Sequence, residues 1–146
     1  QNTDGVFEKH QVFVAPQAGV VVTDADLQPV ALALAARVLD ADGASAQDSL
    51  PPRGPVLIIG RDATVDAWLA RHALPARPLV LRGSAQVWAG RDAAGRPYVV
   101  VAARDAVSLK ALERGLPHYG KQSWLVFEGA RALEKGIWPP RKEGVQ

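Results

Sequence analysis

The stretch VLIIGRDATVDAWLARHAL (56–74) holds the pattern that decides the fold. An apolar run, VLIIG, ends at an Arg-Asp pair, and a helical pattern follows at once. The apolar side chains of that pattern recur at helical spacing: Val65, Trp68, Leu69 and His72. We expect Asp62 to cap this helix, with Asp66 in its first turn and Arg71 in its last, because these charges suit the helix dipole. A buried strand that leads directly into an amphipathic helix is typical of an α/β domain.

The same order of strand, Asp and helix occurs twice more, in GVVVTDADLQPVALALAARVLD (19–40) and YVVVAARDAVSLKALERGL (98–116). We expect Asp26 to cap the helix of residues 19–40 and Asp105 that of residues 98–116. Gly115 is predicted to follow the helix of residues 98–116 as its C′ residue. The inward-facing residues of the two helices are predicted from their spacing: Leu27, Val30, Leu34, Val38, Leu109, Leu112 and Leu116.

The segments between these units predict hairpins and loops. AQVWAGRDAAGRPYVVVAA (85–103) is interpreted as a hairpin with DAAG as its turn, and SWLVFEGARALEKGIW (123–138) as a second hairpin around Glu128-Gly129. ADGASAQDSLPPRGP (41–55) has no periodicity and is expected to be a flexible connector. VFEKHQVFV (6–14) is either an extra strand or part of a tail.

These patterns predict a single α/β domain over residues 19–139, with tails at 1–18 and 140–146. The expected fold is three-layered and of the Rossmann or flavodoxin type, with helices on both faces of a mixed, largely parallel sheet. We expect about five to seven strands, with β-hairpins in the second half of the chain. The strand order and the oligomeric state do not follow from the sequence.

Composition excludes several classes of function. The 146 residues are 48% hydrophobic and 22% charged, the balance of a globular protein, and the formal net charge is only +2. The basic residues are scattered, which argues against a nucleic-acid interface, and no apolar stretch is long enough to span a membrane. The absence of Cys excludes disulfides, thiolate metal sites and thiol nucleophiles. Because there is no Met, even at position 1, we expect the chain to be part of a longer protein.

A candidate ligand crevice lies where the predicted strands end. In open α/β sheets, ligands bind outside the carboxyl ends of the strands, and Arg-Asp pairs stand at two of these ends. The crevice would gather polar side chains from the three units and from the loop after the third helix: Thr23, Asp24, Arg61, Asp62, Arg104, Asp105, His118 and Tyr119. The simpler interpretation, which the sequence favours, is that each Asp caps a helix and each Arg is solvated. Similarly, Pro117 and Gly120 explain PHYGKQS as a helix stop followed by a turn.

No catalytic or metal-binding constellation is predicted. His10, His72 and His118 lack the spacing of a helical metal site, and the GRDA turn lacks the glycines of a nucleotide-binding loop. Ser84 and Ser123 stand in no G-x-S-x-G elbow, so a hydrolase that uses His118 as acid or base is the weakest hypothesis. Packing is favoured over a carbohydrate or peptide platform for the tryptophans: Trp68, Trp88, Trp124 and Trp138.

The second half of the chain, residues 56–139, carries a resemblance to a known family. Its most specific parts are LPHYGKQSWLVFEG (116–129) and the trailing GIWP (136–139), together with a VW-containing strand and an Asp-capped helix. This segment resembles the C-terminal region of bacterial proteins related to M1-family zinc aminopeptidases.

The resemblance implies an accessory, non-catalytic domain of a larger metallopeptidase, which packs on or regulates a separate catalytic domain of the same parent chain. The family's H-E-x-x-H helix, its further Glu and its G-x-M-E-N segment do not occur here. No catalytic residue therefore carries over, and zinc would belong to the parent protein. The resemblance alone favours an exported or periplasmic hydrolase. The alternative function is a stand-alone module that binds a small ligand or a glycan at the crevice or on the tryptophans.

Overall fold

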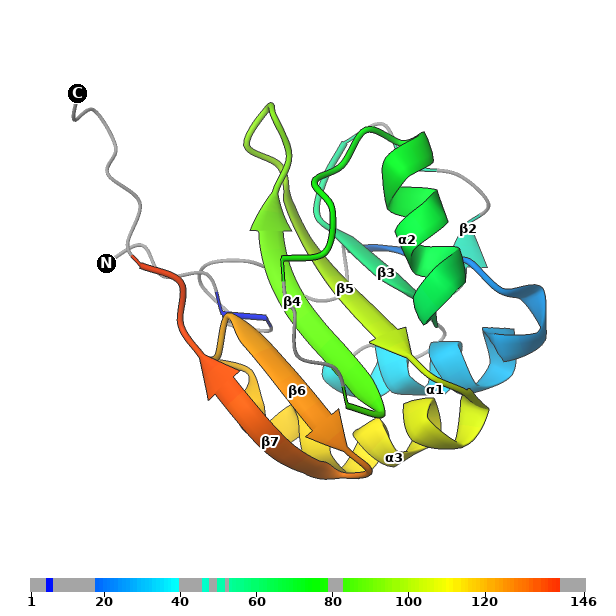
Figure 1. Cartoon of the computed structure of the whole chain (residues 1–146). Coiled ribbons are helices and arrows are strands. Elements are labelled where there is room, and N and C mark those ends of the chain that lie inside the picture. The colour runs from blue at the N-terminus through cyan, green and yellow to red at the C-terminus, as the bar shows by residue number, and fades with distance from the viewer. Residues whose placement is uncertain are drawn as a thin grey trace.

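The chain folds around one mixed sheet. The structure is a computed structural model, which describes residues 5–6, 18–39, 46–47, 50–51, 53–78 and 83–139. Its elements follow in the order β1 (Gly19–Val22), α1 (Gln28–Val38), β2 (Ala46–Gln47), β3 (Val56–Arg61), α2 (Asp62–Arg71), β4 (Ala85–Arg91), β5 (Pro97–Ala103), α3 (Ala106–Gly115), β6 (Trp124–Glu128) and β7 (Arg131–Gly136), with short 3₁₀ turns at Ala25–Leu27 and Leu116–Tyr119. The sheet and the helices confirm an α/β protein (Figure 1).

The seven strands have the order β2-β1-β3-β5-β4-β6-β7. β1 pairs in parallel with β2 and β3, and β3 with β5, whereas β4 pairs antiparallel with β5 and β6, and β6 with β7. The expectation of a largely parallel sheet is therefore wrong, and the longest ladder, seven residue pairs between β4 and β5, is antiparallel. The physical reason is that two tight hairpins fold strands back on themselves, without the crossover helix that a parallel pair requires.

α1 and α3 pack against one face of the sheet and α2 against the other (Figure 1). Leu57 and Ile59 of β3 lie in the cluster under α1 and α3, and Ile58 between them lies in the cluster under α2. This strand is buried on both faces, which explains its unbroken apolar sequence. None of the helices among the described residues is long and apolar enough to cross a membrane.

The inward-facing stripes predicted for the helices are confirmed. The fully buried leucines of α3 and the turn after it all lie in one cluster with α1: Leu109, Leu112 and Leu116. In α1, Leu34 is fully buried, and Val30 and Val38 pack partly buried against the same cluster. Val65, Trp68 and Leu69 of α2 form the opposite layer with the sheet.

The predicted helix ends are confirmed only in part. Asp105 caps α3, because its Oδ1 accepts a hydrogen bond from Ser108 N at 2.8 Å. Asp26 and Asp62 do not cap: the N-cap residues of α1 and α2 are Leu27 and Arg61, and neither helix has a side-chain cap. Each of these two aspartates binds an arginine instead.

Gly115 is the last residue of α3 and not a C′ residue. A Cβ at this position would lie 2.1 Å from the carbonyl oxygen of Ala130. The requirement for glycine is therefore one of packing, since α3 closely approaches the turn between β6 and β7 here.

Both predicted hairpins are confirmed. In the first turn, Asp92 Oδ1 accepts hydrogen bonds from the main-chain N–H of Ala94 and Arg96, at 2.9 and 2.8 Å. The connector 41–55 contributes the two-residue strand β2, which the sequence did not predict. Of the segment 6–14, for which an extra strand or part of a tail was expected, only Val6 is described; it is fully buried and its N–H donates to Gln122 O at 2.7 Å.

Candidate functional site

Arg61 connects the polar residues at the carboxyl ends of the parallel strands. Its main-chain N–H donates to Asp24 Oδ2 at 2.7 Å, and its guanidinium donates to the two carboxylate oxygens of Asp26 at 2.9 and 2.8 Å. The bonded Asp26 raises the pKa of the Arg61 guanidinium, and the charges of Asp24 and Asp105 add to this effect. We call Asp24, Asp26, Arg61, Arg104 and Asp105 the strand-end cluster.

Each charged side chain of the strand-end cluster has a partner within the fold, although its three carboxylates outnumber its two guanidinium groups. The hydrogen bonds from Arg61 lower the pKa of Asp26, and those from Ser108 lower the pKa of Asp105, with smaller contributions from Arg104 and Arg61. Arg104, with a side chain 60% exposed, lies 3.7 Å from the carboxylate of Glu128. Only the pair Arg104-Asp105 fits the simpler interpretation, because Asp105 caps α3 and Arg104 is exposed, whereas Asp62 does not cap α2 and Arg61 is bound by Asp26.

Gly60 allows the residues that follow β1 to lie close to the end of β3. A Cβ at Gly60 would lie 1.7 Å from Thr23 Oγ1 and 2.8 Å from Asp24 Oδ2. Asp24 also accepts a hydrogen bond from Thr23 Oγ1 at 3.1 Å. The glycine of the GRDA turn therefore serves the contact between two strand ends.

Three of the predicted crevice residues do not join this cluster. Asp62 forms an ion pair with another arginine, because its Oδ1 lies 3.2 Å from Arg77 Nη2. His118 and Tyr119 lie beyond the far end of α3, whose ten residues place them about 15 Å along the helix axis from Asp105. His118 is exposed, and the Tyr119 ring stands edge-on to Phe127, with ring centroids 5.9 Å apart.

A second charged cluster lies under α2, and the sequence did not predict it. The Arg77 side chain is only 4% exposed, and its Nη2 lies 3.2 Å from Asp62 Oδ1 and 3.0 Å from Asp66 Oδ1. Its Nη1 donates to the buried Gln86 Oε1, and its Cζ lies 5.1 Å from the ring centroid of the buried Trp88. We call these five residues the Arg77 centre.

Two sequence signals could have revealed the Arg77 centre. Asp62 and Asp66 are four residues apart on a helix, so both carboxylates fall on one face of α2. Gln86 is a polar residue within an otherwise apolar strand, AQVWA. A buried polar side chain needs a partner, and a loop arginine can reach both signals.

The chemistry of the Arg77 centre is that of a structural clamp. A guanidinium does not lose its proton in proteins, and this one is engaged by two carboxylates and an amide oxygen. Trp88 Nε1 is buried and has no hydrogen-bond partner among the described residues. The indole therefore contributes apolar contact and its ring face to Arg77.

The two serines considered as nucleophiles are buried and engaged. Ser84 Oγ donates to Phe127 O at 3.1 Å and accepts from Gly129 N at 2.8 Å. Ser123 Oγ accepts from Trp138 N at 2.8 Å. Both hydroxyls hold the β6–β7 hairpin in place.

His72 and the four tryptophans have packing roles. His72 stacks on Trp68, with ring centroids 3.9 Å apart, and its Nδ1 lies 3.0 Å from Trp68 O. Trp68 and Trp88 are buried, while Trp124 and Trp138 are partly buried with ring centroids 6.3 Å apart. His10 lies outside the described residues, within which no three His, Cys, Asp or Glu side chains are grouped to hold a metal.

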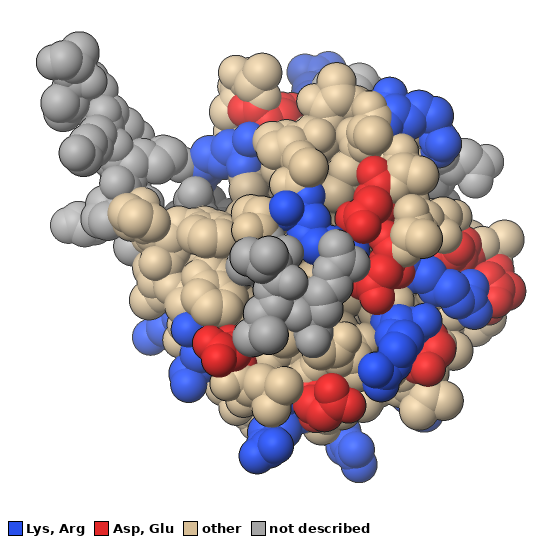
Figure 2. All heavy atoms as spheres, viewed as in Figure 1, with Lys and Arg blue, Asp and Glu red and all other residues tan. Residues whose placement is uncertain are grey.

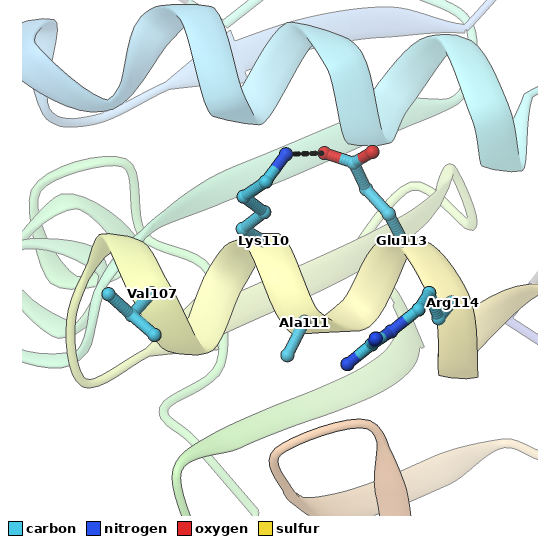
Figure 3. A pocket seen from close by; sticks show the side chains of 5 residues that line it. All are labelled: Val107, Lys110, Ala111, Glu113 and Arg114. Atoms are coloured by element: carbon cyan, nitrogen blue, oxygen red, sulfur yellow. Dashed lines mark ion pairs between the residues drawn. The ribbon is translucent and has the colours of Figure 1, made fainter.

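A hollow of about 380 Å³ lies beside α3 (Figure 3). In the described part of the chain it is lined by Val107, Lys110, Ala111, Glu113 and Arg114. Lys110 and Glu113 project toward α1 and form an ion pair at 3.9 Å. The two lining side chains that could act as a nucleophile, Lys110 and Glu113, are thus paired with each other.

Figure 2 shows acidic and basic side chains interspersed over the face that carries α2, without a patch of one sign. The chain matches no protein-family model, no curated protein and no solved structure. Its function must therefore be argued from the residues themselves.

Proposed function

We propose that this chain is an accessory, non-catalytic α/β domain of a larger M1-like metallopeptidase, packing on or regulating a separate catalytic domain. The proposal starts from the resemblance of LPHYGKQSWLVFEG and GIWP to that family. The observation that carries it further is how these two segments are used in the fold: their side chains and glycines hold the β6–β7 hairpin together.

Three positions illustrate this use. Ser123 is fully buried, its N–H donates to Gly136 O at 2.7 Å, and its Oγ accepts from Trp138 N. A Cβ at Gly136 would lie 2.5 Å from the Trp124 ring, so the indole lies directly over a glycine of the neighbouring strand. A motif whose residues are engaged in packing supports a structural module better than an active site.

The finer description of the fold is also a proposal. We infer that β2-β1-β3-β5, with α1 and α2 on opposite faces, is a three-layer core of the flavodoxin type. The strands β4, β6 and β7 would then be an antiparallel extension of that core. The extension contains WLVFE (124–128) of the first segment that carries the resemblance and Gly136 of the second.

The first test is the reading frame upstream of the codon for Gln1. We expect it to encode an H-E-x-x-H helix and a further Glu, which would bind the zinc of the parent protein. A parent gene without that motif would overturn the proposal.

A second test uses the parent protein and an aminoacyl p-nitroanilide substrate. We expect a zinc chelator to abolish hydrolysis and His118→Ala to leave it unchanged, because His118 is exposed and lies apart from the other candidate residues. Ser123→Ala should lower the stability of this domain, while Lys121→Ala, at a nearby exposed position, should not. Loss of hydrolysis in His118→Ala with an intact fold would contradict the non-catalytic assignment.

The alternative, a module that binds a small ligand or a glycan, has less support because both arginines of the strand-end cluster already lie against a carboxylate. A thermal-shift screen of carboxylic acids, phosphates and oligosaccharides distinguishes it. A ligand that raises the melting temperature with its concentration, and loses this effect in Arg61→Ala, would favour the alternative.

A further inference from the structure

One edge of the sheet is long and open. β7 (Arg131–Gly136) pairs with β6 on one side, and no described strand borders its other side (Figure 1). The opposite edge is β2, which has only two residues. An edge strand presents unpaired N–H and C=O groups to any chain that can align with it.

Exposed apolar side chains flank this edge. Leu133 is 47% exposed and Ile137 is 52% exposed, while most large apolar side chains of the described residues are buried. Leu133 is the extra residue of a β-bulge, because Ala132 pairs with Phe127 and Glu134 with Val126, which leaves Leu133 without a partner on β6. A contact along β7 would cover this side chain.

The pairing with β6 shows which face each charge of β7 occupies. Ala132 packs against the cluster under α1 and α3, as does its partner Phe127, so the adjacent Arg131 points to the α2 face. Glu134 pairs with Val126, which lies between two residues of the α1 and α3 cluster, so Glu134 also points to the α2 face. Lys135, which pairs with Leu125, points to the other face.

We propose that β7 pairs antiparallel with β7 of a second copy of this chain, across a two-fold axis normal to the sheet. Ala132 lies opposite Leu133 of the second copy, and Arg131 lies opposite Glu134 of the second copy. The symmetry repeats the Arg–Glu pair, so two pairs of opposite charge form on the α2 face.

The charges of β7 favour this register over registers that are shifted by one or two residues. Shifting the pairing by one residue sets Arg131 opposite Lys135 of the second copy, which brings like charges together and mixes the two faces. Shifting by two residues sets Arg131 opposite Gly136 of the second copy, so neither Arg131 nor Glu134 lies opposite a residue of opposite charge. The pairing also gives a closed dimer, because among the described strands it uses the long edge of each copy and leaves the short β2 edges.

The contact involves short strands and exposed charges, so the dimer is expected to be weak and dependent on concentration. The proposal is independent of the peptidase assignment, since it rests only on β7. Sedimentation equilibrium should show the mean mass rising from 15.5 kDa toward twice that value as the protein is concentrated. A mass that stays at one chain throughout the range would overturn the proposal.

Charge exchange tests the register. Glu134→Arg should abolish the dimer by placing two arginines opposite each other, and so should Arg131→Glu by pairing two glutamates. The double variant Arg131→Glu/Glu134→Arg should restore it, while Lys135→Glu, on the other face, should leave it unchanged. Circular dichroism should show that each variant retains the native fold. A dimer that persists in the folded single variants, or is not restored in the double variant, would show that this pairing is wrong.

Discussion

Two arginines of this molecule, Arg61 and Arg77, bind two aspartates each, but in different surroundings. The Arg61 side chain is 37% exposed and its partner Asp26 is 66% exposed. The Arg77 side chain is 4% exposed, lies over Trp88 and reaches the buried Gln86. Similar groups at similar distances therefore differ in their contribution to stability. Water screens the first set, whereas in the second the cation itself is buried, although its two carboxylates are 29% and 39% exposed.

The two arginines also differ in what they hold. Arg61 joins the ends of β1 and β3, which a parallel ladder already connects. Arg77 belongs to the segment 74–78, which is neither helix nor strand, and attaches it to α2 and β4. We infer that a buried ion pair contributes most to stability where the chain segment has no main-chain hydrogen bonds to a neighbouring strand.

The largest effect is expected from Arg77→Met. This change keeps an apolar stem over Trp88 but leaves the carboxylates of Asp62 and Asp66 without their cation. We expect the free energy of unfolding to fall by about 2 to 3 kcal/mol, the lower end of the cost of breaking a buried pair, because the two carboxylates left behind are partly exposed. Urea denaturation followed by tryptophan fluorescence measures it, because Trp88 lies beneath the guanidinium.

Two controls make this prediction specific. Arg71→Met changes an exposed arginine of α2, the helix that carries Asp62 and Asp66, and should alter stability by no more than about 0.5 kcal/mol. Arg77→Lys keeps the charge but not the planar fork, so it should fall between the two. Equal effects of Arg71→Met and Arg77→Met would show that burial does not distinguish the arginines.

The next largest effect is expected from Gly60→Ala, which tests how closely the strand-end cluster is packed. The added Cβ would lie 1.7 Å from Thr23 Oγ1, so the end of β1 must move. We expect a loss of about 2 kcal/mol in the free energy of unfolding, typical of overpacking. The same change in a Thr23→Ala background should cost less, because the nearest atom is gone; an equal cost would place the strain elsewhere.

The sequence predicted those parts of the fold that local chemistry determines. The apolar runs and helical stripes, the Asp105 cap and the Asp92 turn all depend on neighbours in the chain. The direction of the strands was predicted less well, because a hairpin and a crossover place the same apolar run in the sheet. Two close approaches, at Gly60 and Gly115, depend on segments distant in sequence and were invisible for that reason.

The same distinction between local pattern and distant contacts applies to the candidate site. Asp24, Arg61, Arg104 and Asp105 follow strands that proved to be parallel neighbours, so strand-end reasoning placed them correctly. It could not show that Arg77, a loop residue between prolines, is buried over Trp88. That contact depends on the path of a loop, which periodicity does not describe.

A smaller effect, dependent on pH, is expected from Asp105→Asn. Asn can still accept the hydrogen bond from Ser108 N, but it does not titrate. The pKa of Asp105 is lowered in the folded state by the Ser108 hydrogen bonds, so its contribution is present above the unfolded pKa of about 3.9 and is lost as pH falls through the folded value. Wild type should therefore exceed the variant in stability at neutral pH, and the gap should close in acid. A gap that is constant from neutral to acidic pH would contradict the lowered pKa.

The smallest effect is expected from Asp26→Asn, which removes the charge of the most exposed partner of Arg61. Because both side chains are accessible to water, we expect the urea midpoint at neutral pH to stay within experimental error of wild type. The pairing should still be visible in an NMR titration, where the Asp26 carboxyl should titrate below its ordinary range, and closer to that range in Arg61→Gln. A small shift in titration, which corresponds to a stability change within experimental error, is what an exposed arginine should show, in contrast to the large effect expected at Arg77. A clear loss of stability in Asp26→Asn would instead make the strand-end cluster a second structural centre.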